Sequence, residues 1–155
     1  MNRLADATRA GIRPQTCEDI RTALHPNCVV CSPDKPRGLA LQFASAADDT
    51  VVAEFELDET VEGYVGWPHG GITTSILDGA MTNWLFAHGL TCVTAELKVR
   101  FRHPVLLDQP GRVTASLQRA THPLYVLEAH IVQNGQLKVR ATGRFMYAKG
   151  LVGGL

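Results

Sequence analysis

The sequence predicts a single α+β domain with one long, buried helix and five or six antiparallel strands. Three observations support this fold class. Residues 72–88 carry almost no charge and have the period of a helix. Residues 93–102 alternate between apolar and polar side chains, and Asn134-Gly135 separates two further strand-like segments. A helix that is apolar over most of its surface has to be covered, and strands with one apolar face can cover it.

The composition is that of an ordinary soluble domain. The chain has 155 residues, 45% of them hydrophobic, and its 15 basic and 15 acidic residues give no net charge. A chain of this length can bury roughly 70% of its unfolded surface as one domain. It contains no block of five or more basic residues, so nothing favours nucleic acid or an anionic membrane. Without an export signal or a long apolar run, we expect a cytoplasmic protein.

We expect residues 1–36 to form an N-terminal arm and residues 37–150 to form the main domain. Within the arm, residues 17–24 are predicted to be a short helix, and the three prolines between residues 25 and 38 indicate a loop.

The arm also contains four soft metal ligands within 15 residues, namely Cys17, His25, Cys28 and Cys31. Such a set could hold zinc. A single C-x2-C with irregularly spaced partners is a weak signal, however, and half-buried reduced thiols are the other interpretation. The sequence therefore predicts no metal and no cofactor.

Strands are predicted from alternation and from turn signals. The segments with these features are residues 38–44, 50–57, 111–120, 123–133 and 136–148. The clearest strand lies between Cys92 and Val105. In that strand, alternation places one set of side chains inward, namely Val93, Ala95, Leu97, Val99 and Phe101. The other set should face outward, namely Thr94, Glu96, Lys98, Arg100 and Arg102.

Residues 72–88 allow two interpretations. Asp78-Gly79 is itself a hairpin signal, and the isoleucines and threonines nearby favour strands. A helix fits better, because at 100° per residue most polar side chains share one arc of about 100°, namely Thr74, Ser75, Asp78 and Thr82. Asn83 does not fit this division. Gly89 stands where a C-terminal cap glycine belongs, so we expect one long central helix.

Asp78 is the only Asp, Glu, Lys or Arg between Gly63 and Ala95. An unpaired charge in such an apolar segment is costly, or it is neutralised through a shifted pKa. Asp78 is therefore a cap, a turn residue, a paired core group bonded to Thr74 or Thr82, or a group that takes part in catalysis.

Three segments resemble one known family. Residues 63–81, "GYVGWPHGGITTSILDGAM", resemble its His-Gly-Gly motif with an acid seven positions after the second glycine. Residues 94–105 are similar to the strand that follows its helix, and residues 25–39 to an N-terminal Cys-x-x-Cys loop of some members. From about Cys28 to Tyr147 the chain thus resembles the PaaI-type acyl-CoA thioesterases of the hotdog-fold thioesterase superfamily. This implies a curved sheet around the helix, a homodimer with a continuous sheet or a dimer of dimers, and active sites between subunits.

The resemblance also implies catalytic roles. The Gly70 N–H, at the positive end of the helix, would polarise the thioester carbonyl. Asp78 would act as a general base on water, or as a nucleophile through an anhydride. Thr94, from the facing subunit, would hold the water or the acid. An acyl-CoA substrate and no cofactor are therefore expected.

Other residues are expected to bind substrate. His69 and Gly71 belong to the turn at the helix start, and Arg100 and Arg102 could contact CoA phosphates from the strand that follows. Several relatives have Asn or Gln seven residues before the first glycine. This chain has Gly63 there, beside Glu62, so Glu62 or Thr94 takes over that role or the site is weaker.

Two other functions keep the same fold. An enoyl-thioester hydratase or dehydratase needs an acid and a histidine that converge on the substrate. This chain has Asn83 five residues after Asp78, where such relatives have His, which argues against that reaction. A non-catalytic dimer that binds acyl-CoA has no need of a buried acid. The motifs of serine hydrolases, nucleotide hydrolases and zinc proteases are absent from the sequence.

Overall fold

The structure, a computed structural model, describes residues 17–150, so residues 1–16 of the expected arm lie outside it. A six-stranded antiparallel sheet has the strand order β1-β2-β6-β7-β8-β5, and β3 and β4 form a separate small ribbon. With one long helix, α3, this confirms the predicted fold class. The elements are α2 (Cys17–Leu24), β1 (Ala44–Ser45), β2 (Val51–Glu56), a 3-10 turn (Glu59–Val61), β3 (Glu62–Tyr64), β4 (Trp67–Pro68), α3 (Gly70–Ala87), β5 (Cys92–Phe101), β6 (Pro110–Thr121), β7 (Leu124–Gln133) and β8 (Gln136–Tyr147).

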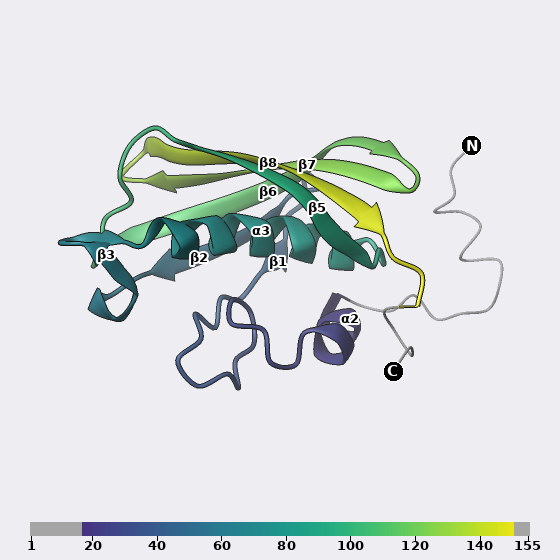
Figure 1. The fold of residues 1–155 in the computed structure, drawn as a ribbon, viewed down its shortest axis with the longest axis horizontal. Coiled ribbons are helices and arrows are strands. Elements are labelled where there is room, and N and C mark those ends of the chain that lie inside the picture. Colours follow the sequence, from purple (N-terminus) through teal and green to yellow (C-terminus); the bar gives the residue numbers. More distant parts are fainter. Residues whose placement is uncertain (1–16, 151–155) are drawn as a thin grey trace.

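Helix α3 lies between the sheet and the arm. Figure 1 shows the sheet over one side of α3, and α2 with the loop that follows it on the other side. The helix and the sheet share one core, which includes the fully buried Leu77, Met81, Ile131 and Phe145. Each such side chain contributes about 1.5–3 kcal/mol by leaving water. Among residues 17–150, no helix is long and apolar enough to cross a membrane.

Both ends of α3 are capped by specific local contacts. At the start, Nδ1 of His69 accepts a hydrogen bond from the Gly71 N–H at 2.9 Å. At the end, Gly89 has a φ of 68°, a left-handed conformation that glycine adopts without strain. The Leu90 N–H bonds back to the Leu85 carbonyl at 2.9 Å, as in a Schellman cap. The predicted cap glycine is confirmed, and a hairpin within residues 72–88 is wrong.

The strand expected at residues 38–44 is wrong, because β1 contains only Ala44–Ser45. Instead, the Leu41 N–H donates to the carbonyl of Val30 at 2.8 Å. Ala40 has a φ of 50°, which interrupts any extended run. The backbone in this segment therefore pairs with the arm and ties it to the domain.

The hairpin predicted at Asn134-Gly135 is confirmed. The two residues have φ values of 51° and 72°, as a type I′ turn requires, and they join β7 to β8.

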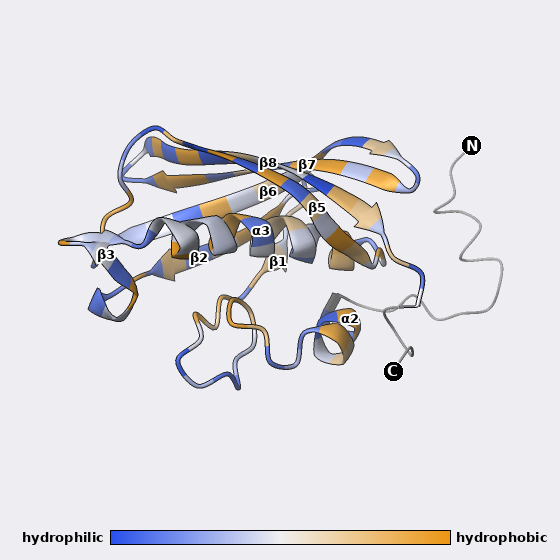
Figure 2. Ribbon diagram, viewed as in Figure 1, coloured by the Kyte–Doolittle hydropathy of each residue, from blue (hydrophilic) through white to orange (hydrophobic). Residues whose placement is uncertain are grey.

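Strand β5 contains a β-bulge that the sequence pattern does not reveal. The register with β8 shifts between Thr94 and Glu96, which leaves Ala95 without a partner. Thr94 therefore lies opposite the buried Phe145 and faces α3, whereas Val93 faces outward and is 45% exposed. The predicted inward and outward faces are reversed for Val93 and Thr94, but they hold from Glu96 onward. Figure 2 shows the alternation as bands along the strands.

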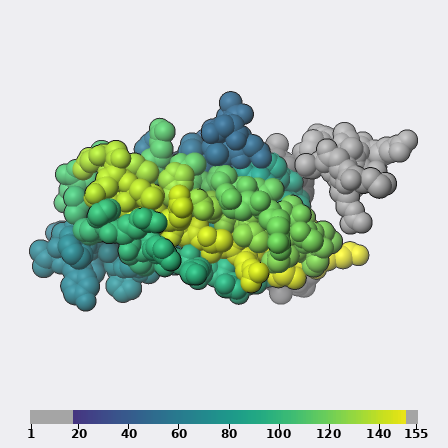
Figure 3. Space-filling view, turned by 90° about the horizontal axis from the view of Figure 1, so that it is seen from above, coloured from purple at the N-terminus to yellow at the C-terminus, as the bar shows by residue number. Residues whose placement is uncertain are grey.

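The outer face of the sheet is a solvated surface. Figure 3 views the molecule from this side, where β5 to β8 cover it. Exposed ion pairs link neighbouring strands, and such pairs contribute about 0–1 kcal/mol each. The pairs are Arg112–Glu54 at 2.5 Å, Arg144–Glu96 at 3.2 Å and Arg140–Glu128 at 3.5 Å.

Candidate active site

Two cavities beside α3 contain candidate site residues. The first, here called the central cavity, has a volume of about 360 Å³ and lies between α3, β5 and the arm. The second, the N-terminal cavity, has a volume of about 420 Å³ and lies where α3 begins, next to the β3–β4 ribbon and the end of β5. The polar arc predicted on the helix lines the central cavity, and Asn83 belongs to it: the lining residues of α3 are Thr74, Ser75, Asp78, Gly79, Thr82 and Asn83.

Asp78 lies in the middle of α3, half-buried in the wall of the central cavity. The hydroxyl of Thr94 donates to Oδ1 of Asp78 at 2.9 Å. Burial raises the pKa of Asp78 above its ordinary value, and the Thr94 hydrogen bond and the charge of His25 oppose the shift. A carboxylate with a raised pKa is a stronger base, so this group suits proton abstraction near neutral pH.

The partner of Asp78 is not one of the two threonines of its own helix, but the residue that the resemblance implied for holding the water or the acid. It is neither Thr74 nor Thr82, which lie on the same helix, but Thr94 of β5. The resemblance placed Thr94 on the facing subunit, whereas here both residues belong to one chain. The bulge at Ala95 produces this contact, because it turns Thr94 toward α3.

The start of α3 offers one unused backbone donor. The Gly71 N–H is occupied by the His69 ring, but no described residue accepts a hydrogen bond from the Gly70 N–H. Gly70 lines the N-terminal cavity together with Trp67 and Phe101. A free N–H at the positive end of a helix can bind the oxygen of a polarised carbonyl.

Glu62 and Gly63 shape the turn before the helix. A side chain at Gly63 would place its Cβ 2.8 Å from Cα of His69, so only glycine allows this close approach. Oε1 of Glu62 accepts a hydrogen bond from the Gly66 N–H at 2.6 Å. In this chain both residues make contacts that support the turn, and neither lines a cavity with Asp78.

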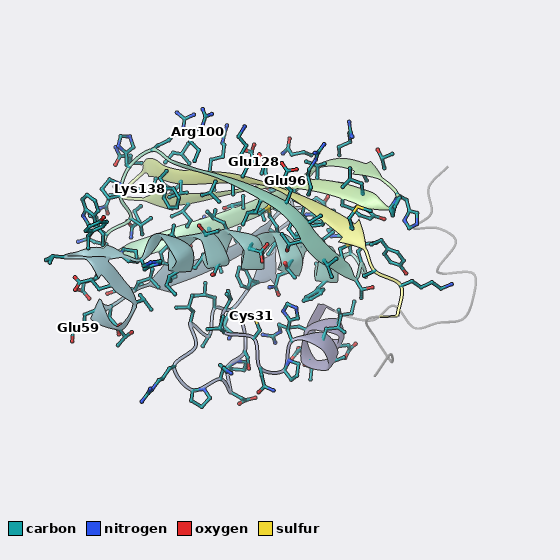
Figure 4. All side chains as sticks on the ribbon, in the orientation of Figure 1. Cys31, Glu59, Glu96, Arg100, Glu128 and Lys138 are labelled. Carbon is teal, nitrogen blue, oxygen red and sulfur yellow. The ribbon has the colours of Figure 1, made fainter. Side chains whose placement is uncertain are left out.

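The two predicted CoA-binding arginines lie in different places. Arg102 lines the N-terminal cavity beside Gly70. Arg100 lies opposite Arg140 on the outer face of the sheet and points away from α3 (Figure 4).

One chain does not bring Gly70 and Asp78 together. They are eight residues apart on α3, which corresponds to about 12 Å along a helix axis. Gly70 lines the N-terminal cavity and Asp78 the central cavity.

The structure adds residues of the arm that sequence reasoning did not connect with Asp78. His25, Cys28 and Cys31 line the central cavity, and their ligand atoms lie within 4.8 Å of one another. The rings of His25 and Phe86 form a T-shaped pair with a centroid distance of 4.9 Å. Burial lowers the pKa of His25. Burial and the neighbouring Cys28 raise the pKa of Cys31 to about 12. The side chain of Cys17, the fourth ligand in the sequence, lies outside the described part of the structure.

Comparisons with known proteins agree with this architecture. Residues 66–139 match the family model of the thioesterase superfamily. Among curated proteins, none matches the sequence significantly. A solved thioesterase superfamily protein has a TM-score of 0.76 at 21% identity, covering 92% of this chain and 77% of its own. A hypothetical thioesterase of Streptococcus pneumoniae TIGR4 with coenzyme A has a TM-score of 0.65 at 18% identity. The match covers 70% of this chain and 88% of that chain. The E. coli PaaI protein of the phenylacetic acid degradation operon has a TM-score of 0.65 at 18% identity. The match covers 70% of this chain and 83% of that chain.

These matches bear on different parts of the conclusion. At such identities the structural likeness establishes the fold, a hotdog fold with a sheet over one long helix. The sequence match runs from the turn before α3 into β8 and includes both Gly70 and Asp78. The sequence likeness to the thioesterase superfamily is limited to residues 66–139, and the structural likeness shows the hotdog fold.

Proposed function

We propose that this chain hydrolyses acyl-CoA thioesters to a free acid and CoA. The observation that carries the proposal is the Asp78–Thr94 pair, a half-buried carboxylate with a raised pKa in the wall of a cavity. Perturbed carboxyl groups of this kind concentrate at catalytic sites, because acid–base catalysis needs a shifted pKa and burial produces one.

The chemistry requires a base and a site for the oxyanion. Asp78 takes a proton from water while the water oxygen attacks the carbonyl carbon of the thioester. The carbonyl electrons move to oxygen, and the resulting oxyanion is stabilised by a backbone N–H. The C–S bond then breaks, and the CoA thiolate leaves and takes the proton from Asp78. In the nucleophilic version, the Asp78 carboxylate attacks the carbonyl carbon, and the C–S bond breaks as the CoA thiolate leaves. Water then hydrolyses the resulting anhydride to the free acid and the Asp78 carboxylate, and a proton from that water goes to the thiolate.

The separation of the two cavities supports a site shared between two copies of the chain. Gly70 lies too far from Asp78 to act on the same carbonyl within one subunit. A second copy in a homodimer would supply Gly70 to the Asp78 of the first. In this arrangement Trp67 and Phe101 would contact the apolar part of the substrate, and Arg102 its phosphates.

A solved relative offers parallel support. The pneumococcal thioesterase has been crystallised with coenzyme A. In one further structure of that protein an aspartate is replaced by alanine, and in another a threonine is replaced by alanine. The two substituted positions are sixteen residues apart. Asp78 and Thr94 are an aspartate and a threonine with the same separation.

The test is release of free thiol from a panel of short, medium, long and aryl acyl-CoAs. We expect the wild type to hydrolyse some of them and Asp78→Asn and Asp78→Ala to lose about a hundredfold or more, or about 2.7 kcal/mol of barrier lowering. Asp48→Asn is the matched control, because Asp48 accepts a hydrogen bond from Thr50 in a similar pair at an exposed site. A wild type inert on every thioester, or Asp78 variants with unchanged rates, would contradict the proposal.

Enoyl-thioester hydration is the second candidate, and one observation favours it. The helix lacks a histidine near Asp78, but the arm brings His25 into the same cavity. An acid and an imidazole are the groups that this reaction uses. Hydration would appear as loss of the enoyl absorbance of an enoyl-CoA without thiol release, and it should then require both Asp78 and His25.

A further inference from the structure

His25, Cys28 and Cys31 form a compact cluster that the proposed hydrolysis does not use. They follow the pattern H-x2-C-x2-C in the loop after α2. Nδ1 of His25 and Sγ of Cys31 are 4.0 Å apart, and the ligand atoms of all three residues lie within 4.8 Å of one another. Figure 4 shows Cys31 in the loop that follows α2, below α3.

The distances are close to those of a tetrahedral zinc site. Zinc bonds of about 2.0–2.1 Å to nitrogen and about 2.3 Å to sulfur, at the tetrahedral angle, put the two ligand atoms about 3.6 Å apart. The distance between His25 and Cys31 exceeds this by a few tenths of an ångström, and every pair of ligand atoms lies within 4.8 Å, so side-chain rotations would bring the three atoms to one ion. Two thiolates and an imidazole are ligands that zinc prefers.

The backbone of the loop holds this arrangement before any ion binds. The Cys28 N–H donates to the His25 carbonyl at 3.3 Å, and the Ser32 N–H donates to the Cys28 carbonyl at 3.1 Å. The guanidinium of Arg21, from α2, donates to the Cys31 carbonyl at 3.2 Å. These bonds keep the three ligands on one side of the loop, which reduces the ordering cost of binding a metal.

A further contact orients one ligand. The Val30 N–H donates to Sγ of Cys28 at 3.4 Å, which fixes the direction of that side chain. Outer hydrogen bonds to the ligands are a regular feature of protein metal sites.

We propose that His25, Cys28 and Cys31 bind one zinc-class divalent ion per chain, with the fourth coordination position open to the central cavity. All three residues line that cavity together with Asp78, so the open position would be occupied by water or by a substrate atom. Two thiolates balance the charge of the ion, so its binding would release the two thiol protons to solvent. This departs from the prediction of no metal.

The ion would also fasten the arm to the helix. Val30, between the two cysteines, packs so closely on α3 that a Cβ at Gly79 would meet its Cγ1 at 2.7 Å. Metal binding would therefore fix the wall of the cavity opposite Asp78. A disulfide between Cys28 and Cys31 would use the same two sulfurs, so the two states exclude each other.

The test is titration of the reduced full-length chain with Co²⁺ alone. We expect the intense absorption of tetrahedral cobalt and a thiolate-to-cobalt band that saturate at one ion per chain. Zn²⁺ should displace the cobalt and abolish both absorptions. The release of two protons per ion, followed with a pH indicator, is a second measurement on the wild type. Neither readout depends on activity, so the result stands apart from the thioesterase assay.

Variants identify the ligands. Cys28→Ser should abolish the thiolate band, and its half-buried position makes it the substitution most easily tolerated by the fold. Cys92→Ser is the matched control, because Cys92 is a free cysteine on β5 outside the cluster, and it should bind cobalt like the wild type. A wild type without the tetrahedral spectrum would overturn the proposal. So would a spectrum unchanged in folded Cys28→Ser, or a Cys28–Cys31 disulfide that persists under the reducing conditions.

Discussion

Asp78 is subject to two opposing physical demands. Burial in the wall of the central cavity disfavours its charge, while the proposed base catalysis would require the charged form. Thr94 moderates the conflict, because its hydroxyl donates to the carboxylate and stabilises the ionised state. These opposing effects lead to one prediction on rate and one on stability.

The rate prediction concerns the acid limb of the pH profile. We expect kcat/KM for the best acyl-CoA to fall as the pH decreases through a pKa above the ordinary aspartate value of 3.8. Thr94→Val removes a hydrogen bond that lowers this pKa, so its limb should move to higher pH. Thr94→Ser keeps a hydroxyl and should stay near the wild type. If the acid limb of the pH profile of Thr94→Val coincided with that of the wild type, the ionisation of Asp78 would not determine the limb.

The stability prediction has a defined sign. Because the pKa of Asp78 is raised in the folded state, folding favours the protonated carboxyl. Its contribution to stability is complete below the unfolded pKa, near 3.8, and is lost as the pH rises through the folded pKa. Asp78→Asn should therefore resist urea better than the wild type at pH 7, and the difference should shrink toward pH 4. Asp48→Asn should show no such gain, because hydrogen bonds from Thr50 lower the pKa of Asp48.

At the scale of elements, the start of α3 is the feature with chemical consequences. The His69 ring occupies the second N–H, that of Gly71, whereas no described residue accepts a hydrogen bond from the first, that of Gly70. In the proposed function the Gly71 N–H supports the helix, and the Gly70 N–H would bind the oxyanion. The two functions can be separated by substitutions at Gly70.

Gly70→Pro and Gly70→Ala form a matched pair. Proline is well tolerated at the first position of a helix, and His69, with a ψ of 135°, has the extended conformation that precedes proline. Proline removes the N–H, so we expect a loss of about 10²–10³-fold in kcat. Alanine keeps the N–H, and its Cβ would lie 3.7 Å from the Phe101 ring, an ordinary contact. Equal losses in the two variants would mean that the N–H makes no contribution.

At the scale of the whole molecule, β5 is an edge strand with an open side. It has ten residues and pairs only with β8 among the described strands. Apolar side chains are exposed along it and beside it: Val93 is 45%, Phe101 54%, Trp67 45% and Tyr64 79% exposed. A long open edge with exposed aromatic residues favours pairing with another chain. The proposed shared active site requires such a partner.

We therefore expect a homodimer or a dimer of dimers in solution, measured by light scattering after gel filtration. Phe101→Asp should shift the protein toward the monomer, because it places a charge at the apolar end of the open strand. Val126→Asp is the control, since Val126 lies opposite Arg144 on β7, away from this edge. A monomeric wild type would contradict the shared site. A dimer unaffected by Phe101→Asp would place the interface elsewhere.

Local features of the chain were predictable to the extent that they depend on neighbouring residues. The helix follows from its apolar period, its end from Gly89, and the β7–β8 hairpin from Asn134-Gly135. The strand expected at residues 38–44 failed, because its backbone groups bond to the arm rather than to a neighbouring strand. The orientation of Thr94 also failed, since a bulge depends on the fit between two strands and leaves no mark in one of them.

The sequence by itself determined the type of fold and singled out Asp78 as an isolated charge in the most apolar segment. It also showed four soft metal ligands in the arm, but their irregular spacing did not predict a metal site. Only the tertiary structure decided that Thr94 bonds to Asp78, that Gly70 lies at a separate cavity, and that the arm cluster shares the cavity of Asp78. The physical reason is the separation along the chain over which each kind of interaction acts. Periodicity and capping act over a few residues, whereas a cavity is formed by segments far apart in the chain, whose meeting depends on the packing of the whole core.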